Sequence, residues 1–167
     1  MRITGSTLLL ITLAVSSTFA VAAPDSQVAQ RKDMTLTLAN NLASAALAAC
    51  HLEGRTGVVA VVDRGGNLVA VQRDDNVGPH NTLAAQRKAY TALSTKTPTR
   101  LLAERARSTA DAENLNTVPE LLLLGGGVPV LVEGEVIGAI GVAGAGGAAF
   151  DEGCALTAIS KILTATH

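Results

Sequence analysis

Apolar positions between residues 38 and 49 recur at the spacing of one face of a helix. The positions on this face are Leu38, Leu42, Ala45, Ala46 and Ala49. A threonine before such a run is a common helix N-cap, and a glycine after it is a common stop. The pattern therefore predicts a first helix that is capped by Thr37 and ended by Gly54.

Four short valine-rich runs follow a different pattern, that of β-strands joined in pairs by tight turns. The first two runs lie on either side of residues 63–67, whose two glycines can adopt a positive φ. The last two are joined through Glu133-Gly134. The four runs are residues 57–62, 68–72, 128–132 and 135–142. We expect each pair to form an antiparallel hairpin.

Three further helices are predicted between and after these hairpins. They cover residues 80–95, 98–105 and 149–163. Gly78-Pro79 precedes the first of them, and Pro98 opens the second, as proline favours the first helical turn. Residues 108–120 show no period. The order helix, hairpin, helices, hairpin, helix predicts an α+β domain with helices packed on an antiparallel sheet.

The composition limits what this domain can be. Of the 167 residues, 48% are apolar but only 2% are aromatic, so the core must consist of valine, leucine, isoleucine and alanine. The formal charge is -1, and there is no long run of lysine and arginine. Such a chain neither attracts the phosphates of nucleic acid nor has the aromatic residues to stack on bases. We expect no nucleic-acid partner.

The first residues have the pattern of an export signal. Arg2 provides a positive start, residues 8–15 an apolar centre, and Ala20-Val21-Ala22 a small-residue cleavage site. The predicted division of the chain is a signal peptide over residues 1–22, a flexible segment over 23–35 and a folded domain over 36–165. The alternative, an uncleaved membrane anchor, has an apolar centre shorter than the roughly 20 residues that span a bilayer. We expect the mature protein to be periplasmic or secreted, with no membrane partner.

The two cysteines gain a further meaning in an exported protein, because disulfides persist in oxidising compartments. Cys50 and Cys154 each lie on the apolar side of a predicted helix. We interpret them as two buried free thiols. The alternative is one disulfide, which would close a loop of about 100 residues. Their spacing does not suit a structural zinc site, whose ligands lie closer together.

Residues 144–149 match the motif G-x-G-x-x-A between a strand and a helix. A dinucleotide site also needs a following parallel strand and an acidic residue about 20 positions further on. The residues that follow supply neither feature. We therefore interpret this segment as a turn that needs positive φ and close backbone approach.

Few titratable residues stand out as candidates for chemistry. His51 lies near the end of the first helix and His80 at the start of the next, where histidine is most often a capping or surface residue. Arg73, directly after a strand, is a candidate anion contact, with an ion pair to Asp74 or Asp75 as the alternative. The remaining acidic candidates, which we interpret as residues of solvated turns, are Asp63, Asp151 and Glu152.

Several segments together resemble one known family. They are Val59 to Ala70, Arg73-Asp74, Lys88 to Ala92, Gly125 to Val130, Gly134 to Val142 and Asp151-Glu152. Over residues 36–165 the chain is similar to the GlcG/HbpS-like family. The resemblance implies a profilin-like α+β fold, in which a five-stranded antiparallel sheet is flanked by helices, and assembly into homo-oligomers. Members include an exported haem-binding protein that partners a sensor kinase, a protein encoded with glycolate utilisation, and a domain fused to corrinoid adenosyltransferases.

The resemblance implies that the protein binds haem. From the resemblance and the export signal together, we expect a non-enzymatic protein that binds haem or another tetrapyrrole as a carrier, scavenger or sensor accessory. Its partners would be the tetrapyrrole, further copies of the chain and a sensor protein. Imidazole is a common axial ligand of haem iron, so His80 and His51 are the candidate iron ligands. The candidate contacts to the haem propionates are Arg73, Arg87 and Lys88.

Two other functions remain open. One is a small-molecule binder or enzyme of a glycolate-type catabolic pathway, which would use Asp63, Arg73 and the loop 144–147 on a carboxylate or aldehyde. The other is a structural oligomer without a ligand.

Overall fold

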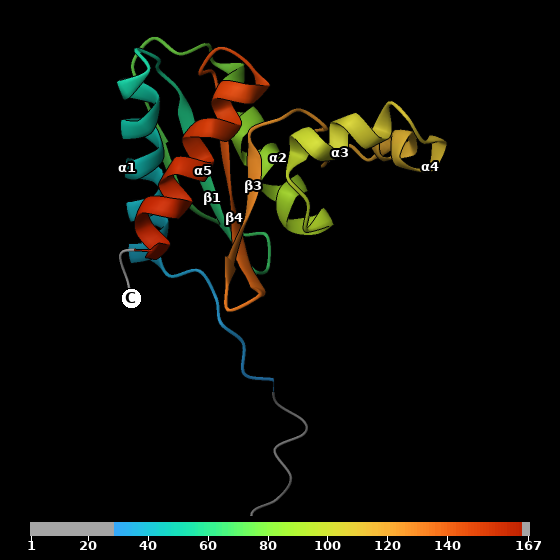
Figure 1. The fold of residues 1–167 in the computed structure, drawn as a ribbon, viewed down its shortest axis with the longest axis horizontal. Coiled ribbons are helices and arrows are strands. Elements are labelled where there is room, and N and C mark those ends of the chain that lie inside the picture. Colours follow the sequence, from blue (N-terminus) through green and yellow to red (C-terminus); the bar gives the residue numbers. More distant parts are fainter. Residues whose placement is uncertain (1–28, 165–167) are drawn as a thin grey trace, which may run out of the picture. The chain divides into compact units, whose positions relative to one another are not determined.

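Four strands form one antiparallel sheet in the computed structural model, which describes residues 29–164 (Figure 1). The strands are β1 (Val58–Asp63), β2 (Leu68–Arg73), β3 (Gly127–Val132) and β4 (Glu135–Ala143). Their order in the sheet is β2-β1-β4-β3, so the two predicted hairpins meet through β1 and β4. The four strands are those that the valine-rich runs predict. The fifth strand implied by the family resemblance is wrong for the described residues.

Helices cover both faces of the sheet. The helices α1 (Leu36–Leu52) and α5 (Ala148–Thr164) pack side by side on one face, and α2 (His80–Thr95) packs on the other (Figure 1). The alternation of strand side chains explains this arrangement, because successive residues point to opposite faces. Val59 and Val61 belong to the core under α1 and α5, whereas Val58 belongs to the core under α2.

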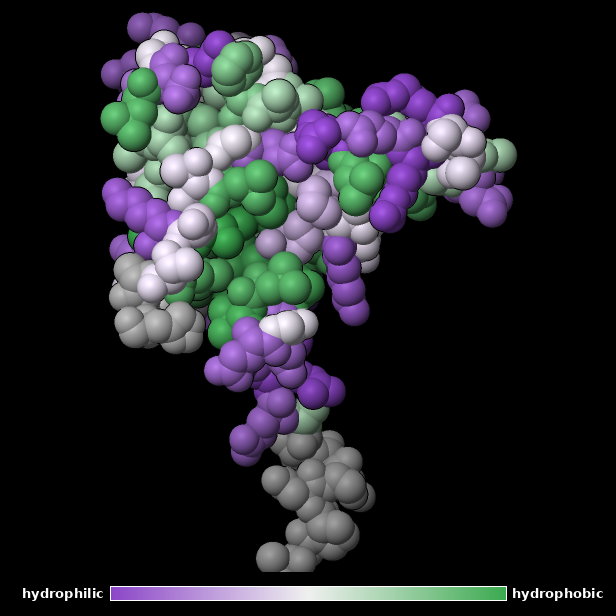
Figure 2. All heavy atoms as spheres, viewed as in Figure 1, coloured by the Kyte–Doolittle hydropathy of each residue, from purple (hydrophilic) through white to green (hydrophobic). Residues whose placement is uncertain are grey.

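The connection between α2 and β3 consists of short helices. They are α3 (Thr99–Ala106), α4 (Ala110–Glu113) and the 3-10 helix η1 (Asn114–Thr117). In Figure 1, α3 and α4 extend away from the sheet, and in Figure 2 their surface is mostly hydrophilic. Residues 108–120 have no apolar period to bury, and they form single turns that contribute no residue to the core.

Glycines allow α2 to approach the sheet at backbone distance. A Cβ atom added to Gly141 would lie 2.1 Å from the carbonyl oxygen of Ala85, and one added to Gly127 would lie 2.2 Å from that of Lys88. Ala89 and Ala92 complete the contact surface of α2 and are fully buried. Close packing through small residues thus replaces the aromatic core that the composition excludes.

The first helix begins earlier than the sequence pattern predicts. Thr35, not Thr37, is the N-cap, and its Oγ1 accepts a hydrogen bond from the backbone N–H of Leu38 at 3.2 Å. Met34, within the segment predicted to be flexible, is 7% exposed and packs in the core. Because Met34 packs in the core, the residues just before it lie against the domain.

A disulfide bond joins α1 to α5, so the prediction of two free thiols is wrong. The Cα atoms of Cys50 and Cys154 are 5.3 Å apart, and the two residues are separated by 104 positions. The sequence places each cysteine on the apolar side of its helix, but only the side-by-side packing of the two helices brings the sulfurs together.

The predicted signal peptide, residues 1–22, lies outside the described residues. Among the residues that are described, no helix is long and apolar enough to cross a membrane.

Candidate functional site

The helix α2 has a second face that the sheet does not cover. Leu83, Arg87 and Tyr90 lie at i, i+4 and i+7, which places them on one side of the helix. Leu83 is 59% exposed and Tyr90 is 38% exposed. A helix face with two large, exposed apolar side chains is typical of a binding surface rather than of a solvated face.

This face of α2 forms one wall of an apolar pocket of about 540 Å³. The β1–β2 hairpin forms the opposite wall, and residues 119–120 close one side. The lining consists of Val62, Gly66, Leu68, Leu83, Gln86, Arg87, Tyr90, Pro119 and Glu120. Its volume lies in the range of small-molecule sites, which are about 300 to 1,000 Å³.

Gly66 brings the hairpin turn against the ring of Tyr90. Its φ is +83°, and an added Cβ would lie 2.9 Å from Cε2 of Tyr90. Two reasons therefore favour glycine at this position: the turn needs a positive φ, and the ring of Tyr90 leaves no room for a Cβ atom. The turn 63–67 has the positive φ that the sequence predicts, and it also positions one wall of the pocket.

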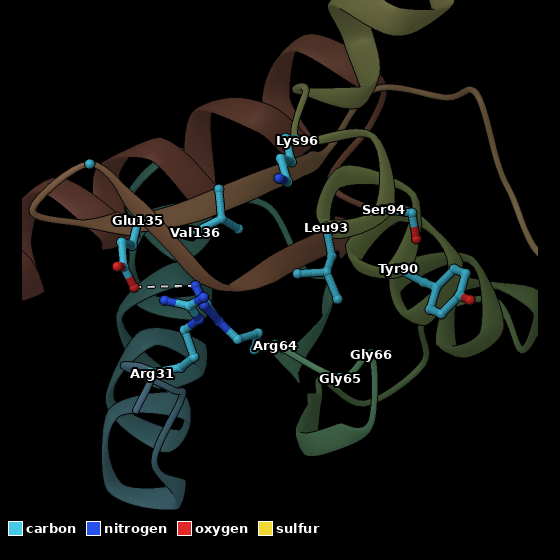
Figure 3. A pocket seen from close by; sticks show the side chains of 11 residues that line it. Arg31, Arg64, Gly65, Gly66, Tyr90, Leu93, Ser94, Lys96, Glu135 and Val136 are labelled. Atoms are coloured by element: carbon cyan, nitrogen blue, oxygen red, sulfur yellow. Dashed lines mark hydrogen bonds and ion pairs between the residues drawn. The ribbon is translucent and has the colours of Figure 1, made fainter. Parts of the chain in front are cut away.

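A second pocket, of about 650 Å³, adjoins the first and shares Gly66 and Tyr90 with it. Basic side chains line it, namely Arg31, Arg64 and Lys96, together with the single carboxylate of Glu135. In Figure 3 the side chains of Arg31 and Arg64 both point toward Glu135. The two pockets together form a site with an apolar part and a basic part.

Neither predicted iron ligand lines these two pockets. His51, in the last turn of α1, holds Asp74 through its Nε2 at 2.9 Å, and Asp74 also accepts the N–H of Gly57 at 2.8 Å. His80 is the exposed first residue of α2. Within the described part of the chain, no group of three His, Cys, Asp or Glu residues is placed to hold a metal ion.

Of the three predicted propionate contacts, only Arg87 lines the apolar pocket. Its Nη2 donates to the carbonyl of Leu121 at 2.6 Å, and its buried Nε has no hydrogen-bond partner. Arg73 does not form the ion pair considered from the sequence. Instead it donates to Thr82 Oγ1 at 3.0 Å and to the carbonyl of Val77, which ties β2 to the start of α2.

Lys88 is 1% exposed and is part of the interior. Its Nζ lies 2.7 Å from Asp151 Oδ2 and 2.9 Å from the carbonyl oxygen of Val142. Asp151 Oδ1 in turn accepts the N–H of Ala145 at 2.8 Å. The ammonium of Lys88 thus serves an internal ion pair and is not presented to either pocket.

The interpretation of Asp151 and Glu152 as residues of a solvated turn is wrong. They are 4% and 7% exposed, because α5 presses its first turn against β4 and the glycine-rich loop. Glu152 pairs with Arg100. The loop itself is the turn that the sequence predicts, and its glycines at 144, 146 and 147 all have positive φ.

The residues proposed for an alternative enzyme site do not converge. Arg73 and the loop after Ala143 meet at the start of β1, because Val58 pairs with both Arg73 and Ala143. Asp63 is at the other end of β1, where it pairs with Gly138. The two ends are five positions apart along the strand, a distance of about 17 Å.

A family model described as "Haem degrading protein HbpS-like" matches residues 34–160. The chain belongs to the HbpS-like family. One curated relative, Protein GlcG of Escherichia coli (strain K12), is 38% identical over 109 residues, which cover 63% of this chain and 80% of GlcG.

Solved structures agree with this membership. A double mutant of HbpS from Streptomyces reticuli is 39% identical, with a TM-score of 0.76 over 87% of this HbpS-like chain and 98% of the other. A complex named PduOC:Heme is 25% identical, with a TM-score of 0.70 over 77% of this chain and 94% of the other. The α+β fold is therefore shared with HbpS and with a haem complex.

Sequence reasoning missed most of the pocket lining. The missed residues are Arg31, Arg64, Leu68, Leu83, Tyr90, Lys96 and Pro119. One signal was present: large side chains at 83, 87 and 90 alternate along α2 with alanines at 85, 89 and 92. Such a helix has one face for packing and another for contact. The basic pocket had no such signal, because its members are 33 and 32 positions apart.

Proposed function

We propose that this HbpS-like protein is an exported, non-enzymatic haem- or tetrapyrrole-binding protein that acts as a carrier, scavenger or sensor accessory. The observation that carries the proposal is the apolar pocket between α2 and the β1–β2 hairpin. The family membership and the structural likeness to a haem complex support the haem-binding part of this proposal.

The pocket suits the flat apolar ring of a tetrapyrrole. Leu68 and Leu83 supply apolar contacts from opposite walls, and Tyr90 supplies an aromatic one. Leu68 and Leu83 are 49% and 59% exposed, so a bound ring would remove apolar surface from water. Arg87, with a buried Nε that lacks a partner, supplies a donor at the same wall.

The donor atoms of the pocket favour tyrosine as the ligand of haem iron. The described residues that line it include no histidine, cysteine or methionine. Tyrosine is a known axial ligand of haem iron. In this proposal Tyr90 meets the iron, while Arg87 interacts with a polar substituent of the ring. When bound, haem would supply a ferric iron for ligand or electron chemistry, and the protein would hold and shield it.

Haemin titration of the apo-protein tests the proposal. We expect a stoichiometric Soret band, and Leu83→Glu should weaken binding about tenfold or more because a carboxylate would be buried against the ring. Leu36→Glu is the matched control, since Leu36 is 61% exposed but lies at the start of α1 and lines neither pocket. Equal affinities of the two variants would refute this pocket.

The iron ligand is tested separately with Tyr90→Phe, which retains the ring and removes the phenol. We expect the Soret and visible bands to shift in this variant and to stay unchanged in His80→Ala and His51→Ala. A shift in either histidine variant, with an unchanged spectrum of Tyr90→Phe, would instead support the ligands predicted from the sequence.

Export is supported by the N-terminal sequence pattern and by the disulfide between Cys50 and Cys154, a bond typical of oxidising compartments. N-terminal sequencing of the protein from the periplasm or medium should begin at Ala23. An N-terminus at Met1, or a protein retained in the cytoplasm, would contradict it.

Assembly into a homo-oligomer is supported by exposed apolar side chains beside an open sheet edge. Leu131 on the edge strand β3 is 48% exposed, and Leu156 on α5 is 49% exposed. Figure 2 shows hydrophobic surface gathered near α5 and β3. Native mass measurement should give a multiple of the chain mass, and a monomer at micromolar concentration would contradict this part of the proposal.

A further inference from the structure

Three basic side chains from distant parts of the sequence converge on one pocket. Arg31 precedes α1, Arg64 lies in the β1–β2 turn, and Lys96 follows the last turn of α2. They line a cavity of about 650 Å³, and among the described residues that line it only Glu135 has a carboxylate. Like charges in a shared cavity repel one another, and the repulsion is relieved when an anion binds between them.

The bonds available within the protein do not satisfy these cations. Arg64 Nη2 lies 3.2 Å from Glu135 Oε2, but Arg64 Nε is buried without a hydrogen-bond partner. Within the part of the chain that the structure describes, the side chains of Arg31 and Lys96 form no hydrogen bond or ion pair. The pocket therefore holds unused donors that suit an anionic ligand.

The residues that follow Arg31 tie this part of the chain to the domain. Asp33 Oδ1 accepts the backbone N–H of Arg64 at 2.9 Å and that of Met34 at 2.8 Å. The side chain of Met34 is buried in the core. These contacts fasten the chain before α1 to the β1–β2 turn, so that the two arginines lie on the same pocket. Arg31 therefore belongs to a segment that contacts the folded domain.

Lys96 occupies a backbone position that favours glycine. Its φ is +50° at the C-cap of α2, in the left-handed region. Glycine is the usual residue there because a Cβ atom is disfavoured in this conformation. The side chain of Lys96 lines the basic pocket, which gives a reason for a lysine at a position where glycine would be more stable.

We propose that Arg31, Arg64 and Lys96 form a carboxylate-binding site, and that it takes the propionate groups of a tetrapyrrole whose ring lies in the adjoining apolar pocket. The two pockets meet at Gly66 and Tyr90, so one ligand with an apolar ring and a charged edge can occupy both. The identity of the ligand rests on the proposed function. The carboxylate site itself is inferred from the cluster of Arg31, Arg64 and Lys96. A free dicarboxylate is another ligand that could supply the carboxylate groups.

The test compares three ligands in the full-length mature protein: haemin, its dimethyl ester and succinate. We expect Arg64→Gln and Arg31→Gln each to weaken haemin binding about tenfold. The dimethyl ester should bind the wild type more weakly than haemin does and should not distinguish the wild type from these variants. Lys161→Gln, which removes an exposed cation on α5, is the control and should leave all affinities unchanged.

The outcomes separate the site from the proposed function. Equal affinities for haemin and its ester, with no effect of Arg64→Gln on haemin or succinate, would overturn the carboxylate site even if haemin binds. Succinate binding that Arg64→Gln abolishes, in a protein that does not bind haemin, would support the site and refute the proposed function.

Lys96→Gly separates a role in binding from a role in folding. Glycine adopts the left-handed conformation of residue 96 without the strain of a Cβ atom, so Tm should rise by about 2 to 5 °C. Haemin affinity should fall by several fold, because the ammonium group is lost. A more stable protein with unchanged affinity would remove Lys96 from the site.

Discussion

At the scale of single residues, the ion pair of Lys88 and Asp151 places two charges in the interior of the protein. Both side chains are almost inaccessible to water, and each has a backbone partner, Val142 and Ala145 respectively. A buried charge is tolerated when it is paired and hydrogen-bonded, and removal of one partner leaves the other charge uncompensated. The pair connects α2, β4 and α5.

We expect Lys88→Met to lower the free energy of unfolding by about 3 to 5 kcal/mol, because Asp151 would stay buried without its cation. Urea denaturation measures the change. Lys161→Met, at an exposed position of α5, should change stability by less than about 0.5 kcal/mol. Similar values for the two variants would show that the buried pair contributes nothing to the fold.

Asp63 stabilises the hairpin turn in its charged form. Burial raises the pKa of this carboxyl, but hydrogen bonds from the side chain and backbone of Asn67 and from the backbone of Gly65 and Gly66 outweigh it and lower the pKa overall. Since the pKa is lower in the folded state than in the unfolded state, this contribution is present above about pH 4 and is lost as the pH falls through the folded value.

Asp63→Asn should therefore be less stable than the wild type at pH 7, by less than about 1 kcal/mol because solvent screens this turn. The difference should shrink as the pH falls below about 4. Denaturation at a series of pH values measures it, with Asp75→Asn, at an exposed position, as the control. A difference that is constant from pH 7 to 3 would contradict the role of the charge.

At the scale of elements, α2 links the core to the candidate site. One face consists of small residues that pack on β3 and β4, and another presents Leu83, Arg87 and Tyr90 to the apolar pocket. The distance between helix and sheet is set by Gly127 and Gly141, where any side chain would collide with the helix backbone. A shift of α2 would therefore change the pocket as well as the core.

Gly141→Ala tests this coupling. The added Cβ would meet the carbonyl of Ala85, so we expect a loss of about 2 to 3 kcal/mol in stability together with weaker haemin binding. Gly153→Ala is the matched control, because that helical position of α5 faces open space. It should stabilise the protein by about 0.5 to 1 kcal/mol. Denaturation and haemin titration of both variants measure the effects, and full stability of Gly141→Ala would refute the close packing.

At the scale of the whole molecule, the disulfide joins the first and last helices of the domain. Cys50 and Cys154 enclose a loop with a sequence separation of 104 residues, which contains the entire sheet and α2. In the chain-entropy model such a bond stabilises chiefly by restricting the unfolded chain, and the effect grows with loop length. The bond thus acts on the domain as a unit rather than on one element.

We expect the double substitution Cys50→Ala with Cys154→Ala to lower the free energy of unfolding by about 2 to 5 kcal/mol. Denaturation of the wild type under reducing conditions should give a similar loss. If reduction leaves the stability unchanged, the two sulfurs are not bonded in solution, and the interpretation as free thiols would be correct.

The sequence by itself determined the four strands, their pairing into hairpins and the four longer helices, but not α4 or η1. Local patterns were sufficient for this, since valine runs around glycine turns specify hairpins, and Pro79 and the following alanines specify α2. The resemblance also identified the family correctly, although the number of strands that it implied was wrong for the described residues.

Only the tertiary structure decided which distant residues meet. The disulfide depends on α1 and α5 lying on the same face, and the burial of Lys88 depends on Asp151 arriving from α5. The pockets depend on the hairpin turn reaching α2, so His51 and His80 are absent from their lining while Tyr90 and Arg64 are present. Spacing along a chain fixes local geometry, but contacts between elements follow from packing, which no local pattern records.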